Sequence, residues 1–192
     1  YDEGGDTLFL ENIGTISNAH FTSAIVNPFG LNDVGSFASP TFADIDSDNA
    51  LDAFVGNEAG NILFFENIGT INSPVFVAVS TNPFGLSSVN EWAIPTFVDI
   101  DNDVDLDAFV NNMFFKNTGT ATNPVFAAPV TNAFGLTGAN PTFIDVDRDG
   151  DLDVFMGAGG TSFFRNIGTA GSPAFSIGGS SPFGLPGSFY RG

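Results

Sequence analysis

The chain of 192 residues contains no cysteine, a single histidine and only four basic side chains, which are Lys116, Arg148, Arg165 and Arg191. The absence of cysteine excludes disulfide bonds, thiolate metal sites and cysteine nucleophiles. The 22 acidic residues give a net charge of −18, which argues against nucleic acid or an anionic membrane as a partner, because both are polyanions. No apolar run approaches the length of a transmembrane helix, so we expect no membrane span.

Groups suited to catalysis are also scarce. His20 is the only histidine, so Ser-His-Asp chemistry would have to use it, and nothing near it repeats or suggests a nucleophile. Glycoside hydrolysis needs one pair of carboxylates, whereas the acidic clusters of this chain recur with a repeated unit. Metal-assisted hydrolysis needs an open coordination position and usually a histidine or another base nearby. We therefore predict that the protein is not an enzyme.

The chain contains a unit that occurs four times. Each unit carries an Asn-x-Gly-Thr motif, which begins at Asn12, Asn67, Asn117 and Asn166. Each also carries a Phe-Gly-Leu motif, which begins at Phe29, Phe84, Phe134 and Phe183. We predict a single repeat domain over residues 1–192, with units at about 1–39, 40–94, 95–140 and 141–192.

Each unit contains four short apolar segments separated by turn residues. In the second unit these segments are 41–44, 51–55, 62–67 and 75–79. No stretch has a convincing amphipathic helical period, and 23 Phe residues supply ample material for a core. Four strands in about 50 residues are typical of a propeller blade. The predicted fold class is all-β, a β-propeller-like array of four-stranded antiparallel blades that is open or is completed by another chain.

Three of the units carry a nine-residue acidic segment, which we call an Asp loop, at residues 44–52, 99–107 and 145–153. Carboxylates occupy positions 1, 3, 5 and 9 of every loop: Asp44, Asp46, Asp48 and Asp52; Asp99, Asp101, Asp103 and Asp107; Asp145, Asp147, Asp149 and Asp153. Position 7, held by Ala50, Asp105 and Asp151, is expected to add a backbone carbonyl.

Carboxylates this close together repel one another unless a cation lies between them. Calcium takes six to eight oxygen ligands in a flexible shell, and alternating Asp residues on a tight turn supply such ligands. A solvated acidic turn is the alternative, and it becomes weaker when the same pattern recurs three times. We predict about three Ca²⁺ ions, one in each Asp loop.

Position 6 differs among the Asp loops. Gly150 permits the sharp bend expected there, and Asn49 tolerates the same left-handed conformation. Val104 resists a positive φ because it is β-branched. The middle loop is therefore expected to bind more weakly or to bend differently.

The four units share only three Asp loops, so one blade lacks its inner hairpin. Residues 1–26 would supply the outer strands of that blade, and residues 187–192 are a candidate to fill part of the gap. An edge that stays open invites pairing with another chain.

The repeats resemble the FG-GAP/VCBS family, whose motif Asp-x-Asp-x-Asp-Gly-x-x-Asp stands intact at Asp145, Asp147, Asp149, Gly150 and Asp153. In the other two loops Asn49 and Val104 replace the glycine. The resemblance covers nearly the whole chain. It implies a β-propeller, structural calcium and an extracellular setting.

These features predict a calcium-stabilised extracellular structural protein that self-associates into a filament or matrix through unpaired blade edges. Loops of this kind suit millimolar extracellular calcium. One alternative is an adhesin or lectin-like propeller with a protein or carbohydrate ligand, for which Trp92 and Tyr190 are candidate sugar-stacking side chains. Packing of Trp92 against the Pro95 segment is the simpler interpretation of that residue. A non-catalytic segment of a larger secreted protein is the third hypothesis.

Overall fold

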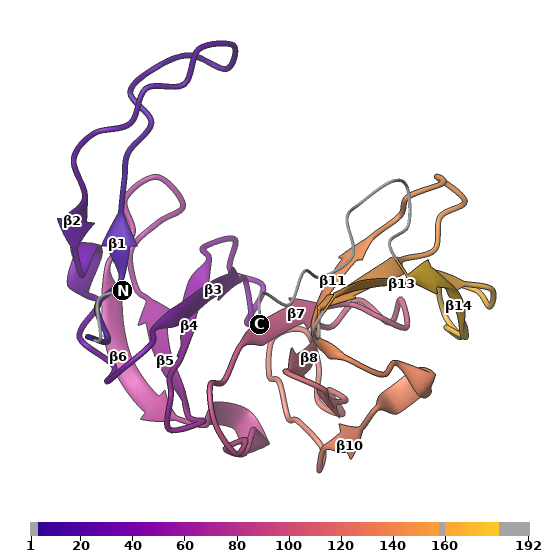
Figure 1. The fold of residues 1–192 in the computed structure, drawn as a ribbon. Coiled ribbons are helices and arrows are strands. Elements are labelled where there is room, and N and C mark those ends of the chain that lie inside the picture. Colours follow the sequence, from indigo (N-terminus) through magenta and orange to yellow (C-terminus); the bar gives the residue numbers. More distant parts are fainter. Residues whose placement is uncertain (1–3, 158–159, 181–192) are drawn as a thin grey trace, which may run out of the picture. The chain divides into compact units, whose positions relative to one another are not determined.

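The computed structural model describes residues 4–157 and 160–180. These residues form fourteen strands and three short 3-10 helices, which confirms the predicted all-β class (Figure 1). The strands make four antiparallel sheets, one with two strands and three with four. The chain divides into two compact units, Tyr1–Pro83 with Ser88–Ala93 and Phe84–Ser87 with Ile94–Gly192. Among the described residues no helix has the length and apolar composition that crossing a membrane requires.

The first unit contains a two-stranded hairpin and one four-stranded sheet. The hairpin pairs β1 (Leu8–Phe9) with β2 (Ile25–Val26). The sheet contains β3 (Ser39–Ala43), β4 (Asp52–Gly56), β5 (Ile62–Asn67) and β6 (Phe76–Thr81) in that order. All four sheet strands lie within two residues of the segments predicted from the apolar pattern.

The second unit contains two further four-stranded sheets with the same sequential order. One is built from β7 (Pro95–Val98), β8 (Asp107–Val110), β9 (Met113–Phe115) and β10 (Val130–Thr131). The other is built from β11 (Ala139–Ile144), β12 (Asp153–Gly157), β13 (Thr161–Asn166) and β14 (Phe175–Ser180). Each four-stranded sheet thus coincides with one repeat of the sequence.

The cores of both units combine side chains of the strands, of which β4 and β8 are buried along their whole length, with apolar side chains of the connecting segments. In the first unit Val55 and Phe65 are buried beside Leu31 and Phe76. In the second unit one cluster joins the two sheets, and it contains Ile100, Phe109, Phe114, Leu136, Val154, Met156 and Phe164. Burying a side chain of this size contributes about 1.5–3 kcal/mol, so the repeated Phe and Val positions supply most of the stability.

The Phe-Gly-Leu motifs form the short helices η1 (Pro28–Gly30), η2 (Pro83–Gly85) and η3 (Ala133–Gly135) together with the Leu that follows each. A Cβ at Gly30 would lie 2.3 Å from the carbonyl oxygen of Phe76. Only glycine permits this approach of the first repeat's turn to a strand of the next repeat. Leu31 and Leu136 are buried in the two cores, which supports a packing role for the motif. The fourth copy, at Phe183, lies outside the described residues, as do Tyr190 and residues 187–192.

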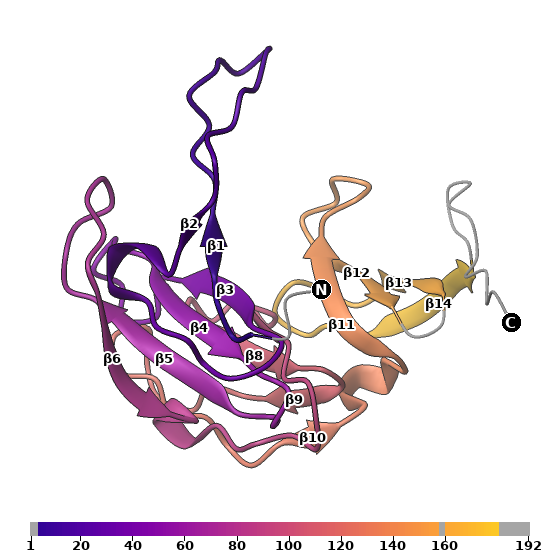
Figure 2. The ribbon, with the colours of Figure 1, turned by 60° about the vertical axis from the view of Figure 1, so that its left-hand side comes forward.

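The hairpin of the first unit is long and largely exposed. Figures 1 and 2 both show the segment between β1 and β2 extending away from the sheet β3–β6. Within the described part of the chain, β1 pairs with β2 alone and its other edge carries no strand. This agrees with the expectation that the first sequence repeat, residues 1–39, lacks an inner hairpin.

Candidate metal centres

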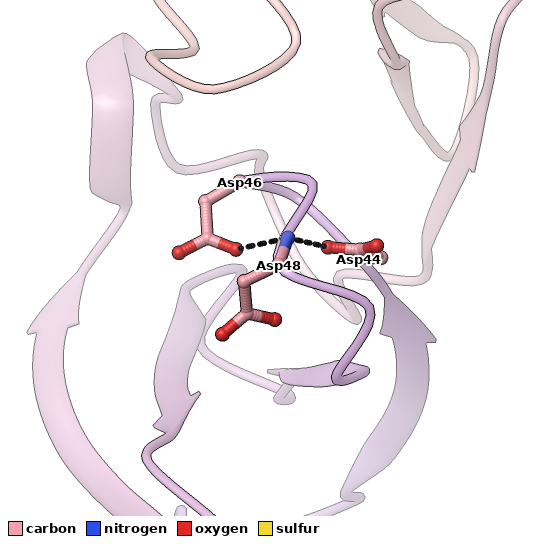
Figure 3. A group of neighbouring side chains, drawn as sticks. All are labelled: Asp44, Asp46 and Asp48. Carbon is pink, nitrogen blue, oxygen red and sulfur yellow. Dashed lines mark hydrogen bonds between the residues drawn. The ribbon is translucent and has the colours of Figure 1, made fainter. Parts of the chain in front are cut away.

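Each Asp loop connects the first and second strands of a four-stranded sheet: β3 with β4, β7 with β8, and β11 with β12. The carboxylates at positions 1, 3 and 5 converge in every copy. One oxygen from each of the three residues lies within 4.8 Å of the other two in the groups Asp44/Asp46/Asp48, Asp99/Asp101/Asp103 and Asp145/Asp147/Asp149. Figure 3 shows the first group, in which the three side chains surround the Asp48 backbone nitrogen.

The position-1 carboxylate organises the turn by accepting backbone hydrogen bonds. Asp44 Oδ1 accepts the N–H of Asp48 at 3.0 Å, and Asp44 Oδ2 accepts the N–H of Asn49 at 3.0 Å (Figure 3). Asp99 and Asp145 accept the N–H groups at the same two positions of their own loops. Side chains of Asp are well suited to such local bonds, so one sequence pattern gives the same turn three times.

Two positions of each loop have a positive φ, and position 6 is one of them. Here φ is 70° at Asn49, 78° at Val104 and 94° at Gly150. The middle loop therefore does not bend differently, although a β-branched residue disfavours this conformation. The N–H of Val104 donates to Asp99 Oδ2 at 3.0 Å, as Asn49 does to Asp44, and this bond holds the strained residue in place.

The position-9 Asp begins the second strand of each sheet and binds the Asn-x-Gly-Thr motif. Its Oδ1 accepts the backbone N–H of that Asn, at 2.8 Å from Asp52 to Asn67, 2.6 Å from Asp107 to Asn117 and 2.8 Å from Asp153 to Asn166. All six of these residues are buried. This hydrogen bond links the end of each Asp loop to the C-terminal end of the third strand of its sheet.

Burial leaves the second oxygen of two of these carboxylates without a hydrogen bond. Within the described part of the chain nothing donates to Asp52 Oδ2 or Asp107 Oδ2, and the two residues are 3% and 0% exposed. Loss of water raises the pKa of Asp52 to about 6 and that of Asp107 to about 7. A buried carboxylate oxygen without a donor beside three converging carboxylates is the arrangement expected of a cation ligand.

The residue at position 7 also faces the loop interior. Its N–H donates to the position-5 carboxylate in each copy, from Ala50 to Asp48, from Asp105 to Asp103 and from Asp151 to Asp149. Asp105 is 8% exposed, its Oδ1 has no hydrogen-bond donor among the described residues, and burial raises its pKa to about 6. The second loop therefore holds one more buried carboxylate than the first.

The donor set of the loops indicates which ion they suit. Two charges 4.8 Å apart repel by about 1 kcal/mol in water and about 3.5 kcal/mol at an effective dielectric constant of 20. The triads are half-buried or exposed, so the smaller figure applies to most of these pairs, and a positive charge among them would relieve a modest repulsion. All side-chain donors are oxygens, and neither His nor Cys is present in the loops. Hard ions such as Ca²⁺ fit this set better than zinc or copper.

Two basic side chains that the sequence analysis did not identify reach the triads. Lys116 forms an ion pair with Asp101 and lies 3.6 Å from Asp103, and its hydrogen bond to Asp101 raises the pKa of the Lys116 ammonium. Arg165 forms an ion pair with Asp147 and lies 3.9 Å from Asp149. The sequence offered one signal for these contacts: Lys116 and Arg165 each directly precede the Asn of an Asn-x-Gly-Thr motif.

The corresponding residue of the first loop's sheet is Glu66, which directly precedes Asn67. The three loops therefore share one geometry but differ in local charge. The second and third each have a cation of the chain beside two of their carboxylates, whereas the first has an acidic residue at that strand position.

The other candidate residues lie apart from the Asp loops. His20 is exposed on the hairpin between β1 and β2, and its N–H donates to Asn12 Oδ1. Trp92 is 53% exposed and contacts Phe37 edge-on, with ring centroids 6.5 Å apart. The expected contact of Trp92 with the Pro95 segment stays a prediction.

No protein-family model matches the chain, and comparison with curated proteins finds no match. The resemblance to FG-GAP/VCBS repeats accordingly rests on the repeated Asp loops themselves.

Proposed function

We propose that the protein is a calcium-stabilised structural repeat protein, built from propeller-like blades of the FG-GAP/VCBS type. The observation that carries this proposal is the buried position-9 carboxylate, held beside a triad of Asp oxygens in three copies. At Asp52 and Asp107 one buried carboxylate oxygen has no donor among the described residues. Such oxygens are stabilised in their ionised form by a cation.

The expected role of calcium is structural. Every Asp loop joins the first two strands of a sheet, and its position-9 Asp binds the third strand. A cation held by the loop therefore fixes three of the four strands relative to one another. It also removes the repulsion between carboxylates that opposes folding.

An extracellular setting and assembly through sheet edges complete the proposal. Exposed triads of this kind suit the millimolar calcium found outside cells. One edge of β1 carries no strand among residues 4–157 and 160–180. This supports self-association or uptake of a strand from another molecule, because an open edge presents free N–H and C=O groups. A filament or matrix built from such contacts is the function we propose.

A calcium titration tests the metal part of the proposal. Each site loaded at 100 times its Kd adds about 2.7 kcal/mol to the free energy of unfolding. We expect EDTA to lower the melting temperature strongly, excess calcium to restore it, and native mass spectrometry to count about three bound ions. A melting temperature that is the same in EDTA and in calcium, with no bound ion, would rule the proposal out.

A binding module is the second candidate, and the exposed pair Trp92 and Phe37 favours it. These two rings are 53% and 42% exposed in the first unit, and exposed aromatic faces are common sugar platforms. Because Trp92 is the only tryptophan, its fluorescence reports directly on a bound sugar. Saturable quenching by a glycan, lost in Phe37→Ala, would favour the adhesin hypothesis over a purely structural role.

A further inference from the structure

The Asn-x-Gly-Thr motif has one set of partners in the three complete sheets. Its Asn is buried, at 5% exposure for Asn67, 2% for Asn117 and 3% for Asn166. In each sheet the Asn N–H donates to the position-9 Asp of an Asp loop, and the Asn67 side-chain amide also donates to the Leu51 carbonyl. The motif therefore serves as the receptor for the Leu-Asp end of an inner hairpin.

The first repeat has the same receptor without this partner. Asn12 Oδ1 accepts the N–H groups of Gly14 and His20, both at 3.0 Å. Asn117 Oδ1 accepts the corresponding two N–H groups, so the turn has the same construction. Asn12 is nevertheless exposed, and no carboxylate in the described part of the chain accepts its N–H.

The direction of the Asn12 N–H follows from the hydrogen bonds on either side of it. Ile13 N–H donates to the His20 carbonyl, and Thr22 N–H donates to the Glu11 carbonyl. Asn12 therefore faces Phe21 as a non-hydrogen-bonded pair, and its own N–H and C=O point to the other edge. This is the edge through which Asn117 binds Asp107 in a complete sheet.

The free edge is also apolar. Leu8 and Leu10 are 53% and 48% exposed, whereas Phe65, which corresponds to Leu10, is 1% exposed beneath β4. A cavity of about 310 Å³ is contiguous with β1 and is lined by Leu8, Phe9, Phe29, Phe42 and Phe76 among others. An incoming strand of Phe and Val residues would find both a partner edge and a space for its side chains.

We propose that the free edge of β1 binds a β-hairpin carrying an Asp loop, whose position-9 Asp accepts the N–H of Asn12. This rests on the proposed function, because it names the partner of the assembling edge. The expected register is that of the complete sheets, where Val55 pairs with Leu63 and Phe54 with Phe64. It places a Val opposite Leu8 and a Phe opposite Phe9.

Counting donors and receptors identifies the source of this hairpin. The chain has three Asp loops and four Asn-x-Gly-Thr motifs, and all three loop hairpins are already paired within their own sheets. Exchange of hairpins among identical copies of these 192 residues would leave one receptor empty in every copy. The occupant is therefore an unpaired Asp-loop hairpin that does not belong to these 192 residues.

The test uses the full chain and a synthetic peptide with the sequence of residues 39–57, which comprises β3, the first Asp loop and β4. We expect saturable binding in calcium by titration calorimetry. In hydrogen exchange, the amides of Leu8, Leu10 and Asn12, which point away from β2, should become protected when the peptide binds. A peptide with Asp52→Ala should bind at least tenfold more weakly, because it lacks the acceptor for Asn12.

The decisive variant is Asn12→Asp, which keeps the acceptor for Gly14 and His20 but sets a negative charge against the incoming Asp. It should weaken peptide binding at least tenfold. Its matched control is Asn18→Asp, which makes the same charge change at the exposed tip of the same hairpin and should bind like the wild type.

Absence of peptide binding or equal binding by both variants would overturn the proposal. Protection at another strand, or amides of Leu8, Leu10 and Asn12 already protected in the free protein, would also overturn it. The calcium-dependent melting temperature of the same samples reports separately on the proposed function. A protein that is stabilised by calcium but does not take up the peptide would refute only the inference about the hairpin.

Discussion

Val104→Gly should stabilise the protein, although the substitution deletes an apolar side chain. Val104 has a φ of 78°, which costs a non-glycine residue about 1–3 kcal/mol and a β-branched residue most. Glycine removes this strain but adds about 0.5–1 kcal/mol of backbone entropy to the unfolded chain. The side chain is 80% exposed, so little packing is lost. The net expectation is a gain of about 1 kcal/mol, or about 2–4 °C in melting temperature for a chain of this length.

The hydrogen bond that defines the turn survives this substitution, because Val104 donates to Asp99 through its backbone N–H. Val125→Gly is the matched control. Val125 is 53% exposed and also donates its N–H to a side-chain oxygen, that of Asn117, but its φ is not positive. It should lose about 0.5–1 kcal/mol.

Differential scanning calorimetry in calcium and in EDTA measures both variants. If Val104→Gly lowers the melting temperature as much as Val125→Gly does, the strain assigned to position 6 does not exist. A gain in calcium alone would mean instead that the strain lies in the ion-bound turn only.

Three further predictions concern the charges of the loops. Lys116→Gln should destabilise the protein in EDTA, because Asp101 and Asp103 lose their counter-charge, and should tighten calcium binding at that loop; calorimetric titration checks both. The raised pKa values of Asp52 and Asp107 mean that the folded apo protein holds protons that the unfolded chain releases near pH 4. Its stability in EDTA should therefore fall as pH rises from about 4 through about 7, and a flat profile would contradict this. Calcium should abolish the fall. Asp107→Asn should weaken calcium binding at the second loop yet raise stability in EDTA at pH 8, as measured by urea unfolding.

Local patterns in the sequence were sufficient to place the strands and the Asp loops. The strands of the sheet β3–β6 are short apolar segments that end at turn residues, so their bounds depend on neighbours in sequence. The triads were predictable for the same reason, because position 1 binds position 5 only four residues away.

Contacts set by strand register were not predictable in this way. Arg165 and Asp147 are 18 residues apart in the sequence. They meet because β13, which carries Arg165, pairs with β12 beside the Asp loop that connects β11 to β12. The middle loop was expected to bind more weakly or to bend differently because of Val104. It does not bend differently, because the bond from the Val104 N–H to Asp99 stabilises the turn against the preference of valine. Weaker binding stays a prediction. The first hairpin forms strands of only two residues, since β1 lacks the neighbour that lengthens β5 and β13.

The residue type at position 9 helps to distinguish two roles, that of a metal ligand and that of a hydrogen-bond acceptor between strands. An asparagine at Asp52 would accept the N–H of Asn67 equally well and would avoid placing a charge where only 3% of the residue is exposed. The same holds for Asp107 and for Asp153, which are also buried. A chain that needed only the link between two strands would gain stability from the amide. The carboxylate at all three positions therefore supports the proposed cation, which would compensate the charge that burial destabilises.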